Sequence, residues 1–180
     1  MSLQLLADLE CISLYHDSAN HWLYVDWQGD LTLPLVQHGC LAIAQHFLQG
    51  DYRQVLNDNT NVTSITPDVS PWLARDYLPY IVLGDVDQIA WVYSPGLSAR
   101  CYTDLAVYAL NSPVVAMFAD MAMACSWLEH VRFKTPDASK NLDDTSLQRL
   151  TQLLQARTDA ASLIEVMGHR GIHLRPTDLS

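Results

Sequence analysis

The residues best suited to bind a ligand form a polar run in the first half of the chain. Arg53–Leu56 is predicted to be a short strand, and it is followed directly by Asn57, Asp58, Asn59 and Thr60. In sheets of parallel strands, ligands bind in the crevice at the carboxyl ends of the strands. This position makes the run a candidate ligand- or partner-binding loop. The alternative is a polar turn, in which the Asn and Asp side chains satisfy the backbone of the loop itself.

A second group of candidate residues lies on the helix predicted to follow this run. Four residues of this helix could line a pocket beside the loop: Trp72, Asp76, Tyr77 and Tyr80. Aromatic residues at helical spacing are also typical of the face that a helix buries in the core. Asp76 would then belong to a solvated face, and the sequence leaves both interpretations open.

Metal sites and the common catalytic motifs are not predicted. Among seven histidines, His38 and His46 share a predicted helix but lie two turns apart, about 12 Å, which is too far to bind one ion. The sequence has no H-E-x-x-H or C-x-x-C pair, no G-x-S-x-G elbow and no glycine-rich nucleotide-binding motif. We therefore expect no metal, no cofactor and no classical enzyme activity.

Composition indicates an acidic globular protein. Of 180 residues, 49% are apolar, which is enough for a hydrophobic core. The formal net charge of -10 disfavours nucleic acid as a partner. No apolar run approaches the roughly 20 residues of a membrane-spanning helix, and the longest one is interrupted at Asp120. With no basic N-terminal signal and four widely spaced cysteines, we expect a cytoplasmic location and reduced thiols.

Turn residues and apolar spacing predict how these residues are positioned. An antiparallel hairpin comes first, formed by Glu10–Tyr15 and Trp22–Trp27. A helix over Leu33–Gln49 follows, with Pro34 in its first turn. Its buried face is predicted from the spacing i, i+4, i+7, i+11 and consists of Val36, Cys40, Ile43 and Phe47.

The remaining elements alternate between helix and strand. Ser70 is expected to cap a helix that Pro79 kinks or ends. The later elements are a strand over Gln88–Tyr93, a short helix over Thr103–Leu110 with Thr103 as its cap, a strand over Val114–Phe118 and a helix capped by Asp120. This order predicts an α/β fold of four or five strands: a mixed, mostly parallel sheet with an N-terminal β-hairpin, covered by helices.

A change of texture after Lys134 predicts a domain boundary. Residues 1–134 would form the α/β domain, and 135–180 a linker and a helical hairpin built from Thr145–Ala156 and Asp159–Met167. A unit of this size is not expected to be stable alone. Its apolar stripes should therefore pack on the main domain or on a partner chain, and a homodimer is the simplest choice.

Three stretches give the chain a family resemblance. They are HWLYVDWQG at 21–29, VLNDNT at 55–60 followed by WLARDYLP at 72–79, and VAMFAD at 115–120 leading to ACSWL at 124–128. With the order of elements from Leu9 to Phe133, they resemble the SpoIIAA-like branch of the STAS family (sulfate transporter and anti-sigma factor antagonist domains). Separately, Asp159–Leu179 resembles the end of the Nif11-like leader domain in its capped helix and PTDL ending.

The STAS resemblance implies a non-enzymatic domain that acts by protein contact. In its best-understood members, a Ser or Thr near the start of the helix after the third strand is phosphorylated, and partner binding is lost. This chain has SITPDVSP at 64–71 where the family has Asp-Ser-Ser-Gly. Thr66 and Ser70 are the candidate phosphoacceptors, since a phosphate at a helix start meets free N–H groups and would add negative charge to an acidic surface.

A similarity of topology to CRAL-TRIO lipid-transfer domains implies an alternative. In that case the domain would bind an apolar small molecule or lipid instead of, or besides, a protein. An enzyme with an unrecognised site is a third hypothesis. The expected partners are therefore a protein or a second copy of the chain, or an apolar small ligand, and neither nucleic acid nor a membrane span.

Overall fold

The computed structural model describes residues 1–49, 52–84, 86–108 and 113–130. The predicted C-terminal linker and helical hairpin at 135–180 lie outside the described residues, and so does the end of the predicted main domain.

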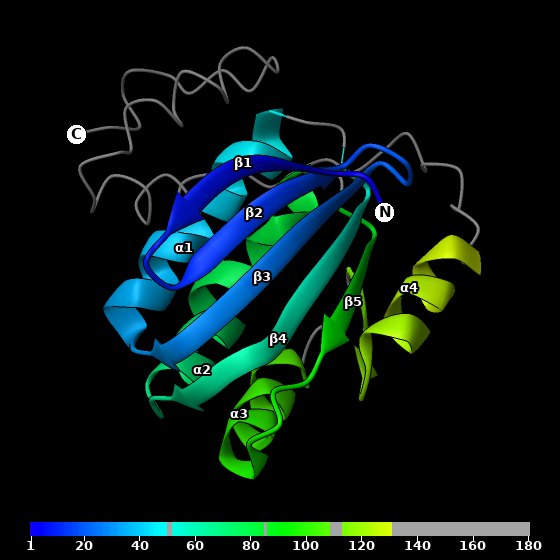
Figure 1. The fold of residues 1–180 in the computed structure, drawn as a ribbon. Helices are drawn as coiled ribbons and strands as arrows, with labels where there is room; N and C mark the ends of the chain where they lie inside the picture. Colours follow the sequence, from blue (N-terminus) through cyan, green and yellow to red (C-terminus); the bar gives the residue numbers. More distant parts are fainter. Residues whose placement is uncertain (50–51, 85, 109–112, 131–180) are drawn as a thin grey trace, which may run out of the picture.

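Six strands form one sheet in the order in which they occur along the chain (Figure 1). The first two pairings are antiparallel, and the next three are parallel. The strands are β1 (Leu3–Leu9), β2 (Ile12–Asp17), β3 (Trp22–Leu31), β4 (Gln54–Ile65), β5 (Gln88–Val92) and β6 (Val114–Phe118). The predicted mixed, mostly parallel sheet is confirmed, and the predicted hairpin is β2–β3. The expected four or five strands were too few, because β1 extends the hairpin to a three-stranded meander.

Helices cover both faces of the sheet. Figure 1 shows α1 (Leu33–Gln49), α2 and α3 (Leu97–Val107) on one side and α4 (Met121–His130) on the other. The α2 segment is one continuous helical stretch of three kinds: α-helix over Val69–Trp72, π-helix η1 over Leu73–Tyr77 and 3₁₀-helix η2 over Leu78–Gly84. Two core clusters follow from this arrangement: a large one on the side of α1 and a small one under α4.

Helix α1 is where prediction and structure agree most closely. Its bounds and its buried face are as the apolar spacing predicted. The helix approaches β3 closely at Gly39, because a Cβ there would lie 2.6 Å from Cη2 and 2.7 Å from Cζ3 of Trp27. The lack of a side chain at Gly39 is therefore what lets the Trp27 ring lie so close beneath the helix.

Two of the three predicted helix caps were wrong. The helix predicted to start at Ser70 begins at Val69 and is preceded by Asp68, so Ser70 is buried in its first turn. Thr103 lies inside α3, where its hydroxyl donates to the Ala99 carbonyl oxygen at 3.0 Å. Asp120 is confirmed as a cap, since its Oδ1 accepts from the Met123 N–H at 2.9 Å.

Strand β4 is the largest departure from prediction. The polar run after Leu56, predicted as a turn, continues the strand to Ile65. Two register shifts against β3 place extra residues in β4, between the pairs Asp26–Asp58 and Gln28–Asn61 and again after Gly29–Val62. At the first bulge, Asp58 Oδ1 accepts from the Thr60 N–H at 2.9 Å. The backbone-satisfying chemistry expected of a turn is therefore present, but within a β-bulge.

Gly39→Ala tests the close approach of α1 to the sheet. The added methyl group should lower the free energy of unfolding by about 1–2 kcal/mol. Overpacking against the rigid Trp27 ring should cost roughly 2–3 kcal/mol, the upper part of the usual range, and the better helix propensity of Ala recovers about 1 kcal/mol. Urea denaturation followed by circular dichroism would measure it. The exposed His38 on the same helix gives the control, because His38→Ala should change stability by less than about 0.5 kcal/mol. Equal stability of Gly39→Ala and wild type would contradict the packing described.

Candidate functional site

The polar residues of β4 point to both faces of the sheet. Every residue from Gln54 to Asn59 is buried. Asn57 and Asn59 line a cavity on the side of α1, whereas Gln54 and Asp58 contact groups on the side of α4. The strand therefore separates the predicted binding run into two sets of side chains that cannot act on one ligand.

The orientation of the Asn57 amide is fixed by Trp27. The indole Nε1 of Trp27 donates to Asn57 Oδ1 at 3.0 Å. An indole N–H can only donate, so the oxygen of the amide must face it. Asn57 Nδ2 then points elsewhere, and it is buried with no hydrogen-bond partner among the described residues.

Trp91 adds a second donor beside Asn57. The two residues are directly opposite each other in the parallel β4–β5 pair, and both side chains line the same cavity. The Trp91 Nε1 is buried and has no partner in the described part of the chain. Two N–H donors from neighbouring strands thus meet on one face of the sheet.

Tyr77 comes to the same cavity from the helical layer. It is the last residue of η1, and it stacks on Trp72 with ring centroids 5.8 Å apart and planes at 14°. Its buried hydroxyl makes no hydrogen bond of ordinary geometry within the described residues. Burial raises the pKa of Tyr77 well above its usual value, and the Cys40 thiol beside it adds to the rise. The hydroxyl therefore stays protonated at neutral pH.

These groups surround an apolar cavity of about 50 Å³. Its walls come from β3, β4, β5, α1, α3 and the helical stretch that follows β4. Ile65, Leu73 and Tyr102 are the partly exposed members of the lining, so the cavity meets solvent between α2, α3 and the carboxyl end of β4. This is the side of a parallel sheet on which ligands bind.

Other polar residues of the lining are satisfied within the protein. Asn59 Nδ2 donates to the Val92 carbonyl oxygen at 3.0 Å, and Thr103 bonds within its own helix. Missing partners are therefore specific to Asn57, Trp91 and Tyr77, and do not reflect loose packing throughout the site.

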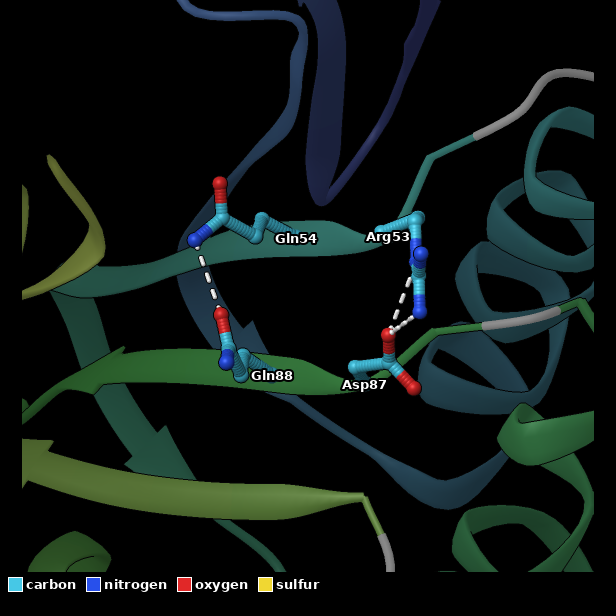
Figure 2. A network of polar contacts seen from close by, with 4 residues as sticks. All are labelled: Arg53, Gln54, Asp87 and Gln88. Carbon is cyan, nitrogen blue, oxygen red and sulfur yellow. Dashed lines mark hydrogen bonds and ion pairs between the residues drawn. The ribbon is translucent and has the colours of Figure 1, made fainter. Parts of the chain in front are cut away.

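The opposite face of β4 carries a structural polar network. Trp22 Nε1 donates to Gln54 Oε1 at 2.8 Å, and Gln54 Nε2 donates to Gln88 Oε1 at 2.8 Å and to the Leu128 carbonyl oxygen at 2.9 Å. Figure 2 shows the Gln54–Gln88 pair beside the ion pair of Arg53 with Asp87, where β4 and β5 begin. This network ties α4 to the sheet, and it uses the indole N–H of Trp22 and both N–H groups of the Gln54 amide.

Asp58 belongs to an acidic, aromatic part of that same face. The Tyr24 hydroxyl donates to Asp58 Oδ2 at 3.0 Å. Burial, followed by the negative charge of Asp58, raises the pKa of Tyr24 far above its usual value. Burial also raises the pKa of Asp26; the hydrogen bond from Asn61 opposes this rise and the charge of Asp58 adds to it. Among the described residues, no group of three or more His, Cys, Asp or Glu is arranged to hold a metal ion.

The structure distributes the other predicted site residues over several environments. Thr60 is exposed, and Asp76 is partly exposed and outside the cavity lining. Trp72 does not line the cavity but supports it through its stack on Tyr77. The side chain of Tyr80 is outside the described part of the chain. Of the predicted set, Asn57, Asn59 and Tyr77 thus share the cavity.

The candidate phosphoacceptors differ in overall burial. Ser70 is buried and lines the cavity. Thr66 is half-buried between β4 and α2, and its Oγ1 has no partner among the residues described. Phosphorylation of either residue stays a prediction, and in this conformation the Thr66 hydroxyl oxygen is as inaccessible to a kinase as the buried Ser70 side chain.

Sequence reasoning missed Trp91 and Trp27 as parts of the site. Both lie in strands that were predicted, but as apolar core residues. A signal was present in the buried strand Gln88–Val92, where an indole N–H needs a partner when it is buried. Its place beside Asn57 follows only from the β4–β5 register, which a single sequence does not give.

The contrast between Tyr77 and Trp27 gives a test of the site. Tyr77→Phe should leave the free energy of unfolding unchanged or raise it by up to about 1 kcal/mol, because it removes a buried hydroxyl with no ordinary hydrogen bond. Trp27→Phe should lower it by about 1–3 kcal/mol, because Asn57 Oδ1 is left unsatisfied. Urea unfolding of both variants measures the difference. A loss above about 1 kcal/mol in Tyr77→Phe would mean that the hydroxyl has a partner.

Comparison with known proteins gives one solved structure. No family model matches the chain, and no curated protein matches it. In the part of the chain that the structure describes, no helix is long and apolar enough to cross a membrane. The structure is similar to an uncharacterized protein from the DUF3478 family with a SpoIIAA-like fold from Shewanella loihica PV-4, at 16% identity and a TM-score of 0.43, covering 69% of this chain and 99% of that chain. That description names the fold that the sequence resembles; a likeness of this degree says nothing about what the chain binds.

Proposed function

We propose that the α/β domain is a binding module for a small, mostly apolar ligand. The observation that carries the proposal is the apolar cavity between the sheet and the helices, which retains buried polar atoms without partners. A buried donor left unsatisfied costs about 1–3 kcal/mol. Sites that bind small molecules combine such apolar walls with a few polar groups that fix the ligand.

The size of the cavity favours a small ligand over a long-chain lipid. A cavity of roughly 150 Å³ is needed to hold benzene, and this one measures about 50 Å³. It therefore suits a ligand of a few heavy atoms, or one end of a larger molecule whose remainder leaves between Ile65, Leu73 and Tyr102. This narrows the apolar-ligand alternative that the sequence suggested.

Binding without catalysis is part of the proposal. The side chains that line the cavity include Ser70 and Cys40, either of which could be a nucleophile. A serine or cysteine nucleophile needs a neighbouring base or cation to activate it. The described lining contains no His, Asp, Glu, Lys or Arg to supply one.

Xenon, which binds dry apolar cavities, gives a direct test. Xenon pressure should shift the indole and methyl resonances of the lining residues in NMR spectra of the full chain. Val55→Leu, which adds a methylene to the lining, should weaken xenon binding at least threefold. Val114→Leu is the matched control, because Val114 is exposed on β6 and outside the lining. Unchanged spectra under xenon, together with no extra mass in native mass spectra of the purified protein, would refute the proposal.

A second candidate function, of the protein-contact kind that the STAS resemblance implies, has support on α3. Leu97, Leu105 and Tyr108 lie on one side of this helix and are 78%, 65% and 91% exposed. We propose a second copy of the chain as the occupant. Helix α3 carries one Arg and one Asp and so has no net charge, whereas the chain as a whole carries -10. The helix itself therefore adds no net repulsion between two copies that meet along it.

Sedimentation of charged variants tests the α3 contact. Leu105→Asp should convert a dimer into a monomer, because it would bury an additional carboxylate between the exposed apolar side chains of the two copies. Met123→Asp is the control, since Met123 is a comparably exposed apolar residue on α4. Wild-type protein that remains monomeric up to high micromolar concentration would rule out this second function.

A further inference from the structure

The unpartnered atoms of the cavity share one chemical character. Asn57 Nδ2 and Trp91 Nε1 can only donate hydrogen bonds, and the hydroxyl of Tyr77 can donate as well as accept. The lining contains no buried oxygen that can only accept and lacks a partner, among the residues described. The cavity is therefore unbalanced toward donors, and its natural complement is an acceptor.

The two N–H groups belong to side chains that are neighbours in the lining of the cavity. Their residues are opposite each other across the parallel β4–β5 pair, with both side chains on the cavity face. The hydrogen bond from the Trp27 indole fixes the orientation of the Asn57 amide, so the NH₂ group of that amide points away from Trp27. An oxygen with two lone pairs can accept from both donors at once.

The charge of the acceptor distinguishes a neutral carbonyl ligand from an anionic one. A carboxylate or phosphate would bring a full negative charge into an apolar cavity. Burying such a charge without a cation is far more costly than burying a neutral carbonyl. The described lining has no Lys or Arg, and the chain carries a net charge of -10. Both facts select against an anion.

We propose that the cavity binds a neutral carbonyl compound, whose oxygen accepts from Asn57 Nδ2 and Trp91 Nε1 and whose apolar body extends toward Ile65, Leu73 and Tyr102. Ketones, esters and amides share this chemistry. The inference rests on the small-ligand function proposed above and adds to it the class of the ligand. Tyr77, across the cavity, is the third group able to donate to the same ligand.

Three compounds of four heavy atoms and similar planar shape separate the possibilities: acetone, isobutene and acetate. Each is titrated into the full-length protein at neutral pH while the indole N–H resonances are followed by ¹H–¹⁵N NMR, the Trp91 signal being identified by its loss in Trp91→Phe. Acetone should shift the Trp91 resonance and bind at least fivefold more tightly than isobutene. Acetate should bind more weakly than acetone.

Two variants test the donors separately. Trp91→Phe keeps an aromatic ring but removes the N–H, and it should weaken acetone binding relative to isobutene binding about three- to tenfold, the worth of one hydrogen bond. Asn57→Asp keeps an acceptor for Trp27 but loses the NH₂ donors, and it should act in the same direction. Isobutene accepts no hydrogen bond from an N–H group, so Trp91→Phe should not weaken its binding; the smaller ring enlarges the cavity for both compounds alike. Trp127→Phe, on α4 at the other face of the sheet, is the matched control.

The outcomes distinguish the two levels of the proposal. If acetone and isobutene bind equally to the wild-type protein, the carbonyl inference is wrong while the small-ligand function stands. If acetate binds most tightly, the ligand is an anion and the inference is also wrong. If none of the three binds and xenon does not bind either, both proposals fail, and ordered water satisfies the donors. The comparison in wild-type protein decides the matter even where a variant does not fold.

Discussion

The need to satisfy the buried polar side chains of β4 is the constraint on which the structure depends. This strand lies between β3 and β5 and is buried on both faces from Gln54 to Asn59. A polar group in such a place is costly unless it is hydrogen-bonded. Each of these side chains therefore has a specific hydrogen-bond partner. Gln54 donates to Gln88 and to the Leu128 carbonyl oxygen, Asn57 accepts from Trp27, and Asn59 donates to the Val92 carbonyl oxygen. The register of three strands and the seat of α4 follow from these bonds, since a slip of one residue would turn every side chain to the wrong face.

In the lining of the cavity, the buried polar groups are only partly hydrogen-bonded. Asn57 has an oxygen and a nitrogen to satisfy, and Trp27 satisfies only the oxygen. The same face brings in Trp91 and, from a π-helical segment, Tyr77. Native proteins rarely leave buried donors without partners, and the exceptions need an explanation. π-helical turns occur frequently at functional sites, so the irregular helix and the unmet donors both direct attention to the same few residues.

The fold was predictable where local signals and burial agree. Helix α1, strand β6 and the cap at Asp120 have periodicity or capping chemistry that the structure keeps. Strand β4 was not predictable, because Asn and Asp favour turns and only their partners on β3 and β5 hold them in a strand. The site was predictable only in part, because its polar residues can be identified from the sequence but their neighbours on other strands cannot. Asn57 and Asn59 stood out as polar residues in a suggestive place, whereas the pairing of Asn57 with Trp91 depends on strand order, which local sequence does not encode.

The two bulges of β4 determine the phase of its side chains. In an ideal strand, residues two apart share a face, yet Asn59, Val62 and Ile65 all belong to the inner face and are three apart. Each step of three contains one bulge, which adds a residue and shifts the alternation by half a period. Two such shifts amount to a full period, so the strand leaves the second bulge in the phase in which it entered the first. An insertion or deletion in this stretch is therefore compatible with the mouth of the cavity only in steps of two residues; a single one would turn Ile65 outward and its polar neighbour Ser64 inward.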